Sequence, residues 1–397
     1  MKVLHISSSA TGGAGIAAKN LVEAERESGI DAYLMTRNKS VQHYAITSRG
    51  SLLRRLLSSA NTIFSSLIAR REYSQLTLAS VGMVDERDIS TLNPDVIHIH
   101  NWFNILSWKQ IINLNAHYPL VFTLHDSRLF TGGCHFDLSC GRFVTGCKSC
   151  PAISGPKKFV SISKGRADKY IQKFENYAVI SPSHWLLNLG KHSKFIGDAR
   201  EIQQINNIVQ TNSSVSRSRT KHEKRKIYFI AANPTAPVKG LKLLLEALDE
   251  QFCEEFNLSL VVIGNANPRL IAATKSLPHV MVSGERNNHD VMSDANIGDF
   301  LIVPSKSENS PNVISEAQLS GLLVIAAAVG GIPELVNDGE SGFLFERSIP
   351  SLRNAVIRAI SDDANSIRVN AIRIATSRNY SYEIVEKHIR IYKAFGK

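Results

Sequence analysis

Residues 3–26 begin with Val3-Leu4-His5-Ile6, pass through Gly12-Gly13-Ala14-Gly15, and end in an apolar-periodic run from Ile16 to Arg26. The pattern predicts a buried strand, a glycine loop and a helix, which form the opening unit of a doubly wound α/β domain. Other apolar runs of strand length follow, with amphipathic stretches between several of them, at residues 32–36, 96–100, 120–124 and 177–180. This alternation is typical of parallel strands connected by helices.

A polar, basic segment divides the chain into two halves. Residues 212–226 hold four serines and six Lys or Arg residues, a composition typical of a linker. Strand-like and helical runs then start again and continue through the second half. We therefore predict an N-terminal domain over 1–211, a C-terminal domain over 227–378, and a last helix within 379–397 that could pack back on the first domain.

Length, composition and charge fit a two-domain protein with anionic partners. The chain has 397 residues, more than the roughly 250–300 that one hydrophobic core supports. With 43% hydrophobic and 20% charged residues, the composition excludes a disordered or collagen-like chain. The net charge of +11 favours phosphates, nucleic acid or acidic lipid as partners. We find neither a membrane-spanning apolar run nor a signal-peptide pattern, so we expect a cytoplasmic protein.

The stretch from Pro304 to Ala317 reads PSKSENSPNVISEA and follows a predicted strand. Ser310 is a suitable N-cap and Pro311 a suitable first residue for a helix, whose free N–H groups would attract an anion. Glu308 lies just before this helix and Glu316 about two turns inside it. Eight helical residues would place the two carboxylates about 12 Å apart, a span that suits two sugars joined by a diphosphate.

These residues resemble the donor half of family 4 glycosyltransferases, which are retaining enzymes of the GT-B fold. The resemblance rests on Glu308, Glu316, Gly321 and the run Gly330-Gly331-Ile332-Pro333-Glu334. It implies two Rossmann-like domains facing across a cleft, a nucleotide-diphosphate sugar as donor, and no cofactor required for catalysis. It further implies that Glu308 contacts the transferred sugar and that Glu316 contacts the ribose. Contacts with the sugar and phosphates are implied at Asn309, Ser310, Pro311 and Asn312.

Lys239 resembles the family's lysine for the donor diphosphate, where an ammonium offsets the negative charge of the leaving group. The family commonly has an arginine six residues earlier, and this chain has Asn233 there. Lys242 or Arg286 could replace the missing contact.

In the first half, the glycine loop and a later strand carry candidate site residues. The loop around Gly13 could admit a phosphate or an acceptor group, and the resemblance implies that it binds donor. It lacks the GxGxxG spacing, and Arg37 stands where a dinucleotide site would want an acid, which disfavours a nicotinamide enzyme. His125 ends a buried strand and resembles the family's sugar-contacting histidine, with Asp126 available to orient its ring. His98 and His100 share one strand face without a third metal ligand in view.

A cysteine-rich loop at 131–151 has a further candidate site. Four thiols fall within seventeen residues, which allows a structural zinc, disulfides or reduced thiols. The passage from His125 through this loop resembles a family 4 subgroup that includes colanic-acid-type exopolysaccharide and O-antigen glycosyltransferases. The four residues are Cys134, Cys140, Cys147 and Cys150.

Residues 51–71 form a basic amphipathic segment without an acid. It predicts either a helix on an anionic membrane or a helix packed on its own domain with solvated arginines. In the first case the protein is peripheral on the inner face of the cell membrane.

We therefore expect a hexosyltransferase-type glycosyltransferase with retention, acting on a glycan or lipid-linked acceptor in surface polysaccharide biosynthesis. One alternative is a non-catalytic sugar-nucleotide-binding protein, which would suit the absence of an arginine at position 233. Another is a zinc-containing nucleic-acid binder, which the absence of a recognised nucleic-acid motif disfavours. Donor sugar, base and acceptor do not follow from the sequence.

Overall fold

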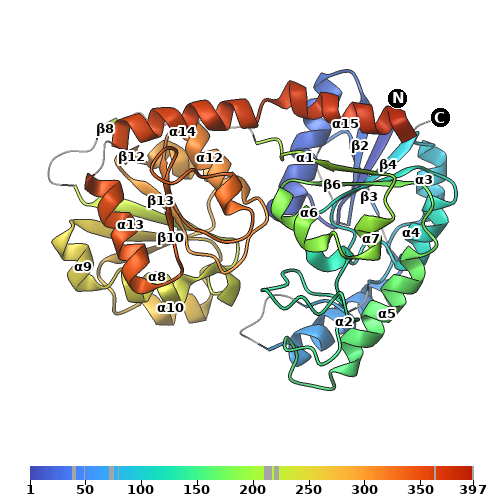
Figure 1. Ribbon diagram of the computed structural model, residues 1–397, viewed down its shortest axis with the longest axis horizontal. Helices are drawn as coiled ribbons and strands as arrows, with labels where there is room; N and C mark the ends of the chain where they lie inside the picture. The colour runs from blue at the N-terminus through green and yellow to red at the C-terminus, as the bar shows by residue number, and fades with distance from the viewer. Residues whose placement is uncertain are drawn as a thin grey trace. The chain divides into compact units, whose positions relative to one another are not determined.

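The computed structural model describes residues 1–37, 42–48, 50–70, 76–78, 80–209, 217–218, 223–361 and 364–395. Contacts divide the chain into two compact units. The first unit comprises Met1–Ile208 with Tyr380–Lys397, and the second comprises Val209–Asn379. Each unit is built on one parallel sheet with helices on both faces (Figure 1).

The first unit has a seven-stranded sheet in the order β3-β2-β1-β4-β5-β6-β7. The chain leaves β1 towards β2 and later returns to β4 on the other side of β1, which makes a topological switch point there. The strands are β1 (Lys2–Ile6), β2 (Asp31–Thr36), β3 (Ala45–Thr47), β4 (Val96–Ile99), β5 (Leu120–Thr123), β6 (Tyr177–Ser181) and β7 (Glu201–Gln204). The helices are α1 (Gly12–Glu27), α2 (Leu52–Ile68), α3 (Glu86–Leu92), α4 (Trp108–Asn115), α5 (Lys158–Ile171), α6 (His184–Gly190), α7 (Lys194–Gly197) and α15 (Ser381–Phe395).

The second unit repeats this plan with a six-stranded sheet in the order β11-β10-β9-β13-β14-β15. Its switch point lies between β9 and β13, because the chain runs from β9 outward to β11 and then returns to β13. The strands are β9 (Arg225–Ile230), β10 (Leu258–Ile263), β11 (Val280–Gly284), β13 (Phe300–Val303), β14 (Leu323–Ala327) and β15 (Phe343–Phe345), with a separate pair β8 (Arg217–Ser218) and β12 (Asn296–Ile297). The helices are α8 (Leu241–Ala247), α9 (Glu250–Glu255), α10 (Pro268–Thr274), α11 (Asn288–Asp294), α12 (Asn312–Ser320), α13 (Ile349–Ser361) and α14 (Ala364–Arg378).

The parallel strands are buried because helices cover both faces of each sheet. Every residue of β4, β5 and β6 is buried, as is every residue of β13 and β14. Separate apolar clusters fill the two faces of the second sheet. The sheets are therefore rigid supports for the loops at their carboxyl ends.

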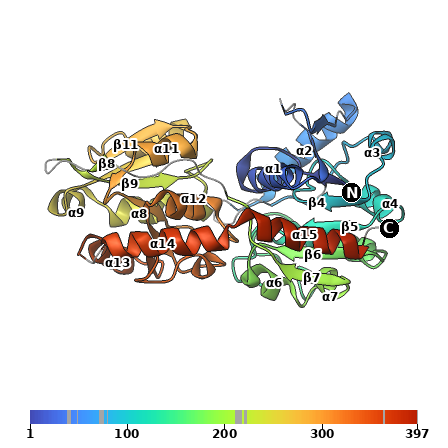
Figure 2. The same ribbon diagram turned by 90° about the horizontal axis from the view of Figure 1, so that it is seen from above.

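Helix α15 belongs to the first unit although it ends the chain (Figure 2). Its apolar face packs with Val3 of β1 and Leu21 of α1 through Ile384, Val385, Ile389 and Tyr392. Helices α1 and α15 thus pack on the same face of the first sheet.

The structure places some boundaries differently from the sequence. Strand β9 begins at Arg225, inside the predicted linker at 212–226, and much of the remaining linker lies outside the described residues. Among the described helices, none is both long and apolar enough to cross a bilayer.

Candidate functional site

Lys239 and Glu308 form an ion pair near the carboxyl ends of the strands in the second unit's sheet. Lys239 ends a short turn (Pro237–Lys239) that follows β9, and Glu308 lies in the loop after β13. The Lys239 Nζ atom is 2.7 Å from Glu308 Oε1, and the Ser305 hydroxyl donates to the same oxygen at 2.9 Å. Glu308 is buried and Lys239 is half-buried. The pair therefore lies where the carboxyl ends of two strands flank the switch point, the usual binding crevice of such sheets.

Two glycines allow the loops of this site to approach closely. A Cβ atom at Gly240, which has a φ of 82°, would lie 2.0 Å from the carbonyl oxygen of Pro304. A Cβ atom at Gly330 would lie 1.9 Å from the carbonyl oxygen of Glu308. The Gly331 N–H donates to that same carbonyl at 3.0 Å. Side chains at positions 240 and 330 would thus push the loops apart, which explains the glycines there.

Glu316 lies in the first turns of α12. Its Oε2 atom accepts a hydrogen bond of 2.5 Å from the amide of Asn288, at the start of α11. Burial raises the pKa of Glu316 above the ordinary value, although the bond from Asn288 acts in the opposite direction. The carboxylate is consequently a partly desolvated acceptor, held in place by a neighbouring helix.

The N-cap residue of α12 differs from the predicted one. The helix begins at Asn312 with Pro311 as its N-cap and without a side-chain capping bond, so the predicted N-cap at Ser310 was wrong. Most of the interval from Glu308 to Asn312 is loop, and the 12 Å estimate for an all-helical interval does not apply. Asn309 is buried, whereas Ser310, Pro311 and Asn312 are half-buried at the mouth of the helix.

Lys242 and Arg286, the two predicted replacements for the family's arginine, each have an acidic partner. Asn233 itself is exposed. Lys242 lies 3.7 Å from Glu246, and Arg286 lies 2.5 Å from Asp294. Sequence reasoning missed another cation, Arg347, whose Nε donates to the carbonyl of Pro304 at 3.3 Å. Since Gly240 packs on that same carbonyl, Arg347 lies beside the lysine loop.

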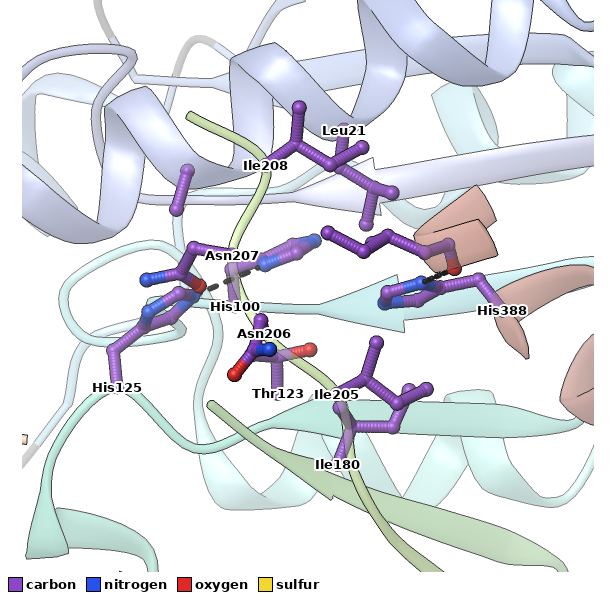
Figure 3. Close-up of a pocket in the computed structure, with 12 residues that line it drawn as sticks. Leu21, His100, Thr123, His125, Ile180, Ile205, Asn206, Asn207, Ile208 and His388 are labelled. Atoms are coloured by element: carbon purple, nitrogen blue, oxygen red, sulfur yellow. Dashed lines mark hydrogen bonds between the residues drawn. The ribbon is translucent and has the colours of Figure 1, made fainter. Parts of the chain in front are cut away.

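In the first unit, His125 lines a small pocket (Figure 3). His100, Thr123, Asn206 and Asn207 line the same pocket. The Nε2 atom of His125 is 3.2 Å from Nδ1 of His100, and burial lowers the pKa of His125 to about 4. The ring is therefore neutral at physiological pH.

Asp126 has a partner other than the His125 ring. Its carboxylate accepts from the Arg128 guanidinium at 2.6 to 3.0 Å, and Arg128 in turn donates to Asn101. Burial would raise the pKa of Asp126, but the neighbouring Arg128 and His135 and the bonds from Arg128 bring it below its ordinary value. His100 is one partner of the His125 ring, and the Asp126 carboxylate also acts on that ring, since its charge opposes the lowering of the His125 pKa by burial.

Gly13 is exposed in the first turn of α1, after β1. A Cβ atom at this position would meet nothing within 4 Å, whereas one at Gly15 would lie 2.4 Å from the carbonyl oxygen of Ser9. Close packing therefore requires the glycine at position 15 but not the one at position 13.

The four loop cysteines are free thiols. Cys134, Cys140 and Cys150 line one small pocket together with Asp137. Cys150 and burial raise the pKa of Cys134, while the hydrogen bond with Cys134 lowers the pKa of Cys150. Burial raises the pKa of Cys147 to about 11.

A third histidine joins the pair that the sequence placed on one strand face. Among the described residues, His5, His98 and His100 are the group of possible metal-binding side chains whose ligand atoms lie within 4.8 Å of one another. The sequence showed no third ligand beside His98 and His100, and the fold brings His5 next to them. A signal was present in the sequence, since each of the three apolar strands at 3–6, 96–99 and 120–123 contains or precedes a histidine.

Comparisons with known proteins agree with this architecture. Residues 224–362 match the family model described as Glycosyl transferases group 1. An uncharacterized glycosyltransferase of Methanocaldococcus jannaschii is 26% identical over 174 residues, which is 43% of this chain and 49% of that protein. WcaC of Escherichia coli, named for colanic acid biosynthesis, is 35% identical over 72 residues, which is 16% of this chain and 18% of that protein. The matches thus span about half or less of these relatives' lengths.

A solved structure matches the whole chain. Anabaena HepE in complex with UDP-glucose has a TM-score of 0.65 at 18% identity, covering 99% of this chain and 100% of that one. The protein therefore has the two parallel-sheet α/β domains of GT-B glycosyltransferases. Its second unit carries the segment similar to the group 1 glycosyl transferases.

Proposed function

We propose that this protein is a family 4 glycosyltransferase that transfers a sugar, with retention, from a nucleotide-diphosphate donor to a glycan or lipid-linked acceptor in surface polysaccharide biosynthesis. The observation that carries the proposal is the ion pair of Lys239 and Glu308 at the switch point of the second sheet. The match of residues 224–362 to glycosyl transferases group 1 supports it, as do the UDP-glucose bound to HepE and the colanic acid assignment of WcaC.

The residues of the second unit have separate roles in this proposal. The Lys239 ammonium neutralises charge that develops on the leaving diphosphate, and Glu308 binds the transferred sugar. Glu316 binds the ribose hydroxyls, and the half-buried loop at 309–312 binds sugar and phosphates at the mouth of α12. Gly13 and His125 contribute donor contacts from the first unit. Lys239 and the helix N-terminus supply positive potential without a required cofactor.

The test is a thermal-shift screen of the full chain against a panel of nucleotide-diphosphate sugars, followed by a transfer assay with lipid-linked glycan acceptors. A donor that binds the folded protein raises its melting temperature. We expect at least one donor to do so and to be consumed only with an acceptor. A protein that binds no nucleotide-sugar would contradict the proposal.

A non-catalytic sugar-nucleotide-binding protein is the second candidate, favoured by Asn233 at the position of the family's arginine. It predicts a thermal shift with donor but no consumption of donor by any acceptor. The neighbouring Arg347 favours the enzyme, since it places a guanidinium beside the lysine loop.

Helix α2 supports a peripheral contact with an anionic membrane. Its leucines point outward, with exposed fractions of 71% at Leu52 and 74% at Leu67, while Ser58 and Ser65 are the buried side chains. A helix packed on its own domain would show the reverse pattern. Exposed apolar residues flanked by arginines suit a surface of acidic lipid. Arg71, the last residue of the predicted segment 51–71, lies outside the described residues.

We expect the protein to float with vesicles that contain anionic lipid and to remain unbound with neutral vesicles. The double variant Arg54→Glu/Arg55→Glu should lower the bound fraction several-fold, because each basic residue near an anionic surface contributes about 1 kcal/mol. The double variant Lys109→Glu/Lys191→Glu, which makes the same change in net charge at two exposed positions outside α2, is the charge-matched control. Equal flotation of wild type and the double variant would contradict the membrane role of α2.

We also propose that Cys134, Cys140, Cys147 and Cys150 hold a structural zinc. Cys134, Cys140 and Cys150 line one pocket, and the lowered pKa of Cys150 favours thiolate ligation. Elemental analysis of anaerobically purified protein should give about one zinc per chain, lost in Cys134→Ser/Cys150→Ser but kept in Cys253→Ser, since Cys253 is buried on α9. Absence of zinc from the wild-type protein would contradict this proposal.

A further inference from the structure

Helix α12, which carries Glu316, is held by hydrogen bonds on two of its sides. Glu316 accepts from Asn288 of α11, as described above. Ser315 and Gln318 are three residues apart, so they share a different face of the helix, and both side chains are buried. This second face bonds to α14, which lies beside α12 in both views (Figure 1 and Figure 2). The helix is therefore fixed between two neighbouring helices.

Arg378 is the last residue of α14 and makes the bonds to this second face. Its Nη2 atom donates to Gln318 Oε1 at 2.6 Å and to the Ser315 hydroxyl at 3.1 Å. Its Nη1 atom donates to the Leu335 carbonyl oxygen at 2.8 Å. Since Leu335 directly follows the short turn Ile332–Glu334, one guanidinium joins α12 to the end of that turn.

Gln318 extends the same network to a further turn. Its side chain is fully buried, and its Nε2 atom donates to the carbonyl oxygens of Leu335 at 3.0 Å and Ser341 at 3.2 Å. The Ser341 hydroxyl in turn accepts from the Asn337 N–H at 2.9 Å. The segment 335–341 is therefore bonded to α12 at both of its ends.

The direction of these hydrogen bonds does not depend on the titration of any group. A guanidinium only donates, and a backbone carbonyl only accepts. Gln318 must therefore turn its oxygen towards Arg378 and its amide nitrogen towards the two carbonyls. Burial lowers the pKa of Arg378 to about 10, so the guanidinium remains charged at neutral pH.

This arrangement requires a forked cation. The acceptors lie at two nitrogens of the guanidinium, with Leu335 at Nη1 and the α12 side chains at Nη2. The ammonium of a lysine is a single point charge on a flexible chain, and it does not reproduce the planar fork. The bonds of Arg378 thus restrain both the rotation of α12 and its distance from the turn.

We propose that Arg378 is a positioning residue of the donor site. It acts through Ser315 and Gln318 and fixes α12 so that Glu316, the residue next to Ser315, presents its carboxylate to the donor. The inference rests on the proposed function, because Glu316 binds the ribose there. The alternative is a purely structural role, in which Arg378 stabilises the second unit without affecting Glu316.

The test is a double-variant cycle on the full chain, read as the dissociation constant of a donor by calorimetric titration. The probe is the nucleotide-diphosphate sugar that gives the largest thermal shift with the wild type. Arg378→Met should raise the dissociation constant about tenfold, within the range of coupling between residues of one hydrogen-bond network. In the Glu316→Ala background the same substitution should change it by less than about twofold, because the group that Arg378 positions is absent.

A purely structural role predicts a different pattern. Loss of stability alone lowers the melting temperature but leaves the donor affinity of the folded protein unchanged. Equal effects of Arg378→Met in both backgrounds, or no effect on affinity in either, would overturn the proposal. Arg373→Met is the matched control, because Arg373 is an exposed arginine on α14, and this variant should bind the donor like the wild type.

Arg378→Lys is the second variant, in case the methionine variant does not fold. It keeps the positive charge and loses the fork, so its dissociation constant should also rise, by about threefold or more. A lysine variant that is folded by circular dichroism and binds the donor with wild-type affinity would overturn the proposal.

Hydrogen exchange of the ligand-free protein tests the restraint on α12 without any donor. The backbone amides of α12 should exchange several-fold faster in Arg378→Met or Arg378→Lys than in Arg373→Met, because local opening depends on the bonds that hold a segment. Equal exchange in these variants would overturn the proposal. Faster exchange of α12 in a protein that binds no nucleotide-sugar would contradict the proposed function instead, so the two failures are distinguishable.

Discussion

Replacing Lys239 with alanine is expected to lower the rate of sugar transfer by about 100- to 1,000-fold, the usual loss when one preorganised electrostatic group is removed from a developing anion. The variant also leaves Glu308 without the cation that lies 2.7 Å from it, so the buried carboxylate loses its compensating charge. The measurement is kcat with saturating donor and acceptor.

Lys242→Ala is the matched control for this prediction. Lys242 is three residues further along, highly exposed, and paired only loosely with Glu246 at 3.7 Å. We expect its kcat to remain within about twofold of wild type, since exposed ion pairs contribute little. Equal activity of Lys239→Ala and Lys242→Ala would refute the role of Lys239 in leaving-group stabilisation.

Replacing Glu316 with alanine is expected to raise the dissociation constant of the donor about 10- to 100-fold. Hydrogen bonds to a charged group contribute roughly 1.5–3 kcal/mol, and the ribose offers two hydroxyls. Because burial raises the pKa of Glu316, protonation removes its charge at a higher pH than for an ordinary glutamate. Donor affinity of the wild type should therefore fall as the pH is lowered, beginning above the ordinary glutamate range. Calorimetric titration measures both effects.

Glu254→Ala is the control for the second prediction, because Glu254 is an exposed glutamate on α9. Its donor affinity should match that of the wild type. If Glu316→Ala binds the donor as tightly as Glu254→Ala does, the ribose contact is refuted.

Much of the fold could be predicted because local patterns agree with the global architecture. The apolar runs at 3–6 and 300–303 are short, continuous and bounded by polar or glycine-rich loops, which is the pattern of strands buried on both faces. The motif residues Lys239 and Glu308 could also be named, since each follows a strand whose carboxyl end supports a site. Their contact could not be predicted, because 69 residues separate them and only the order of β9 and β13 in the sheet brings them together.

The sequence alone also could not predict which face of α2 is exposed to solvent. Its sequence fits both a packed and an exposed apolar face, and the hydrophobic periodicity is identical in the two cases. Ser58 and Ser65 are the buried side chains of α2, and Ser65 accepts a hydrogen bond from the Leu78 N–H, so the leucines face outward. The structure places the N-cap of α12 at Pro311, and in the loop before it the Glu308 carbonyl accepts from the Gly331 N–H, a contact between segments distant in the sequence.

The sequence by itself determined the two α/β halves, the glycine loops and the residues expected to bind a donor, since these depend on spacing along the chain. Only the tertiary structure decided that His125 is partnered by His100 and that Arg378 bonds to α12. Hydrogen bonds between side chains on separate strands and helices depend on sheet order and register, and these arise from packing of distant segments rather than from neighbouring residues.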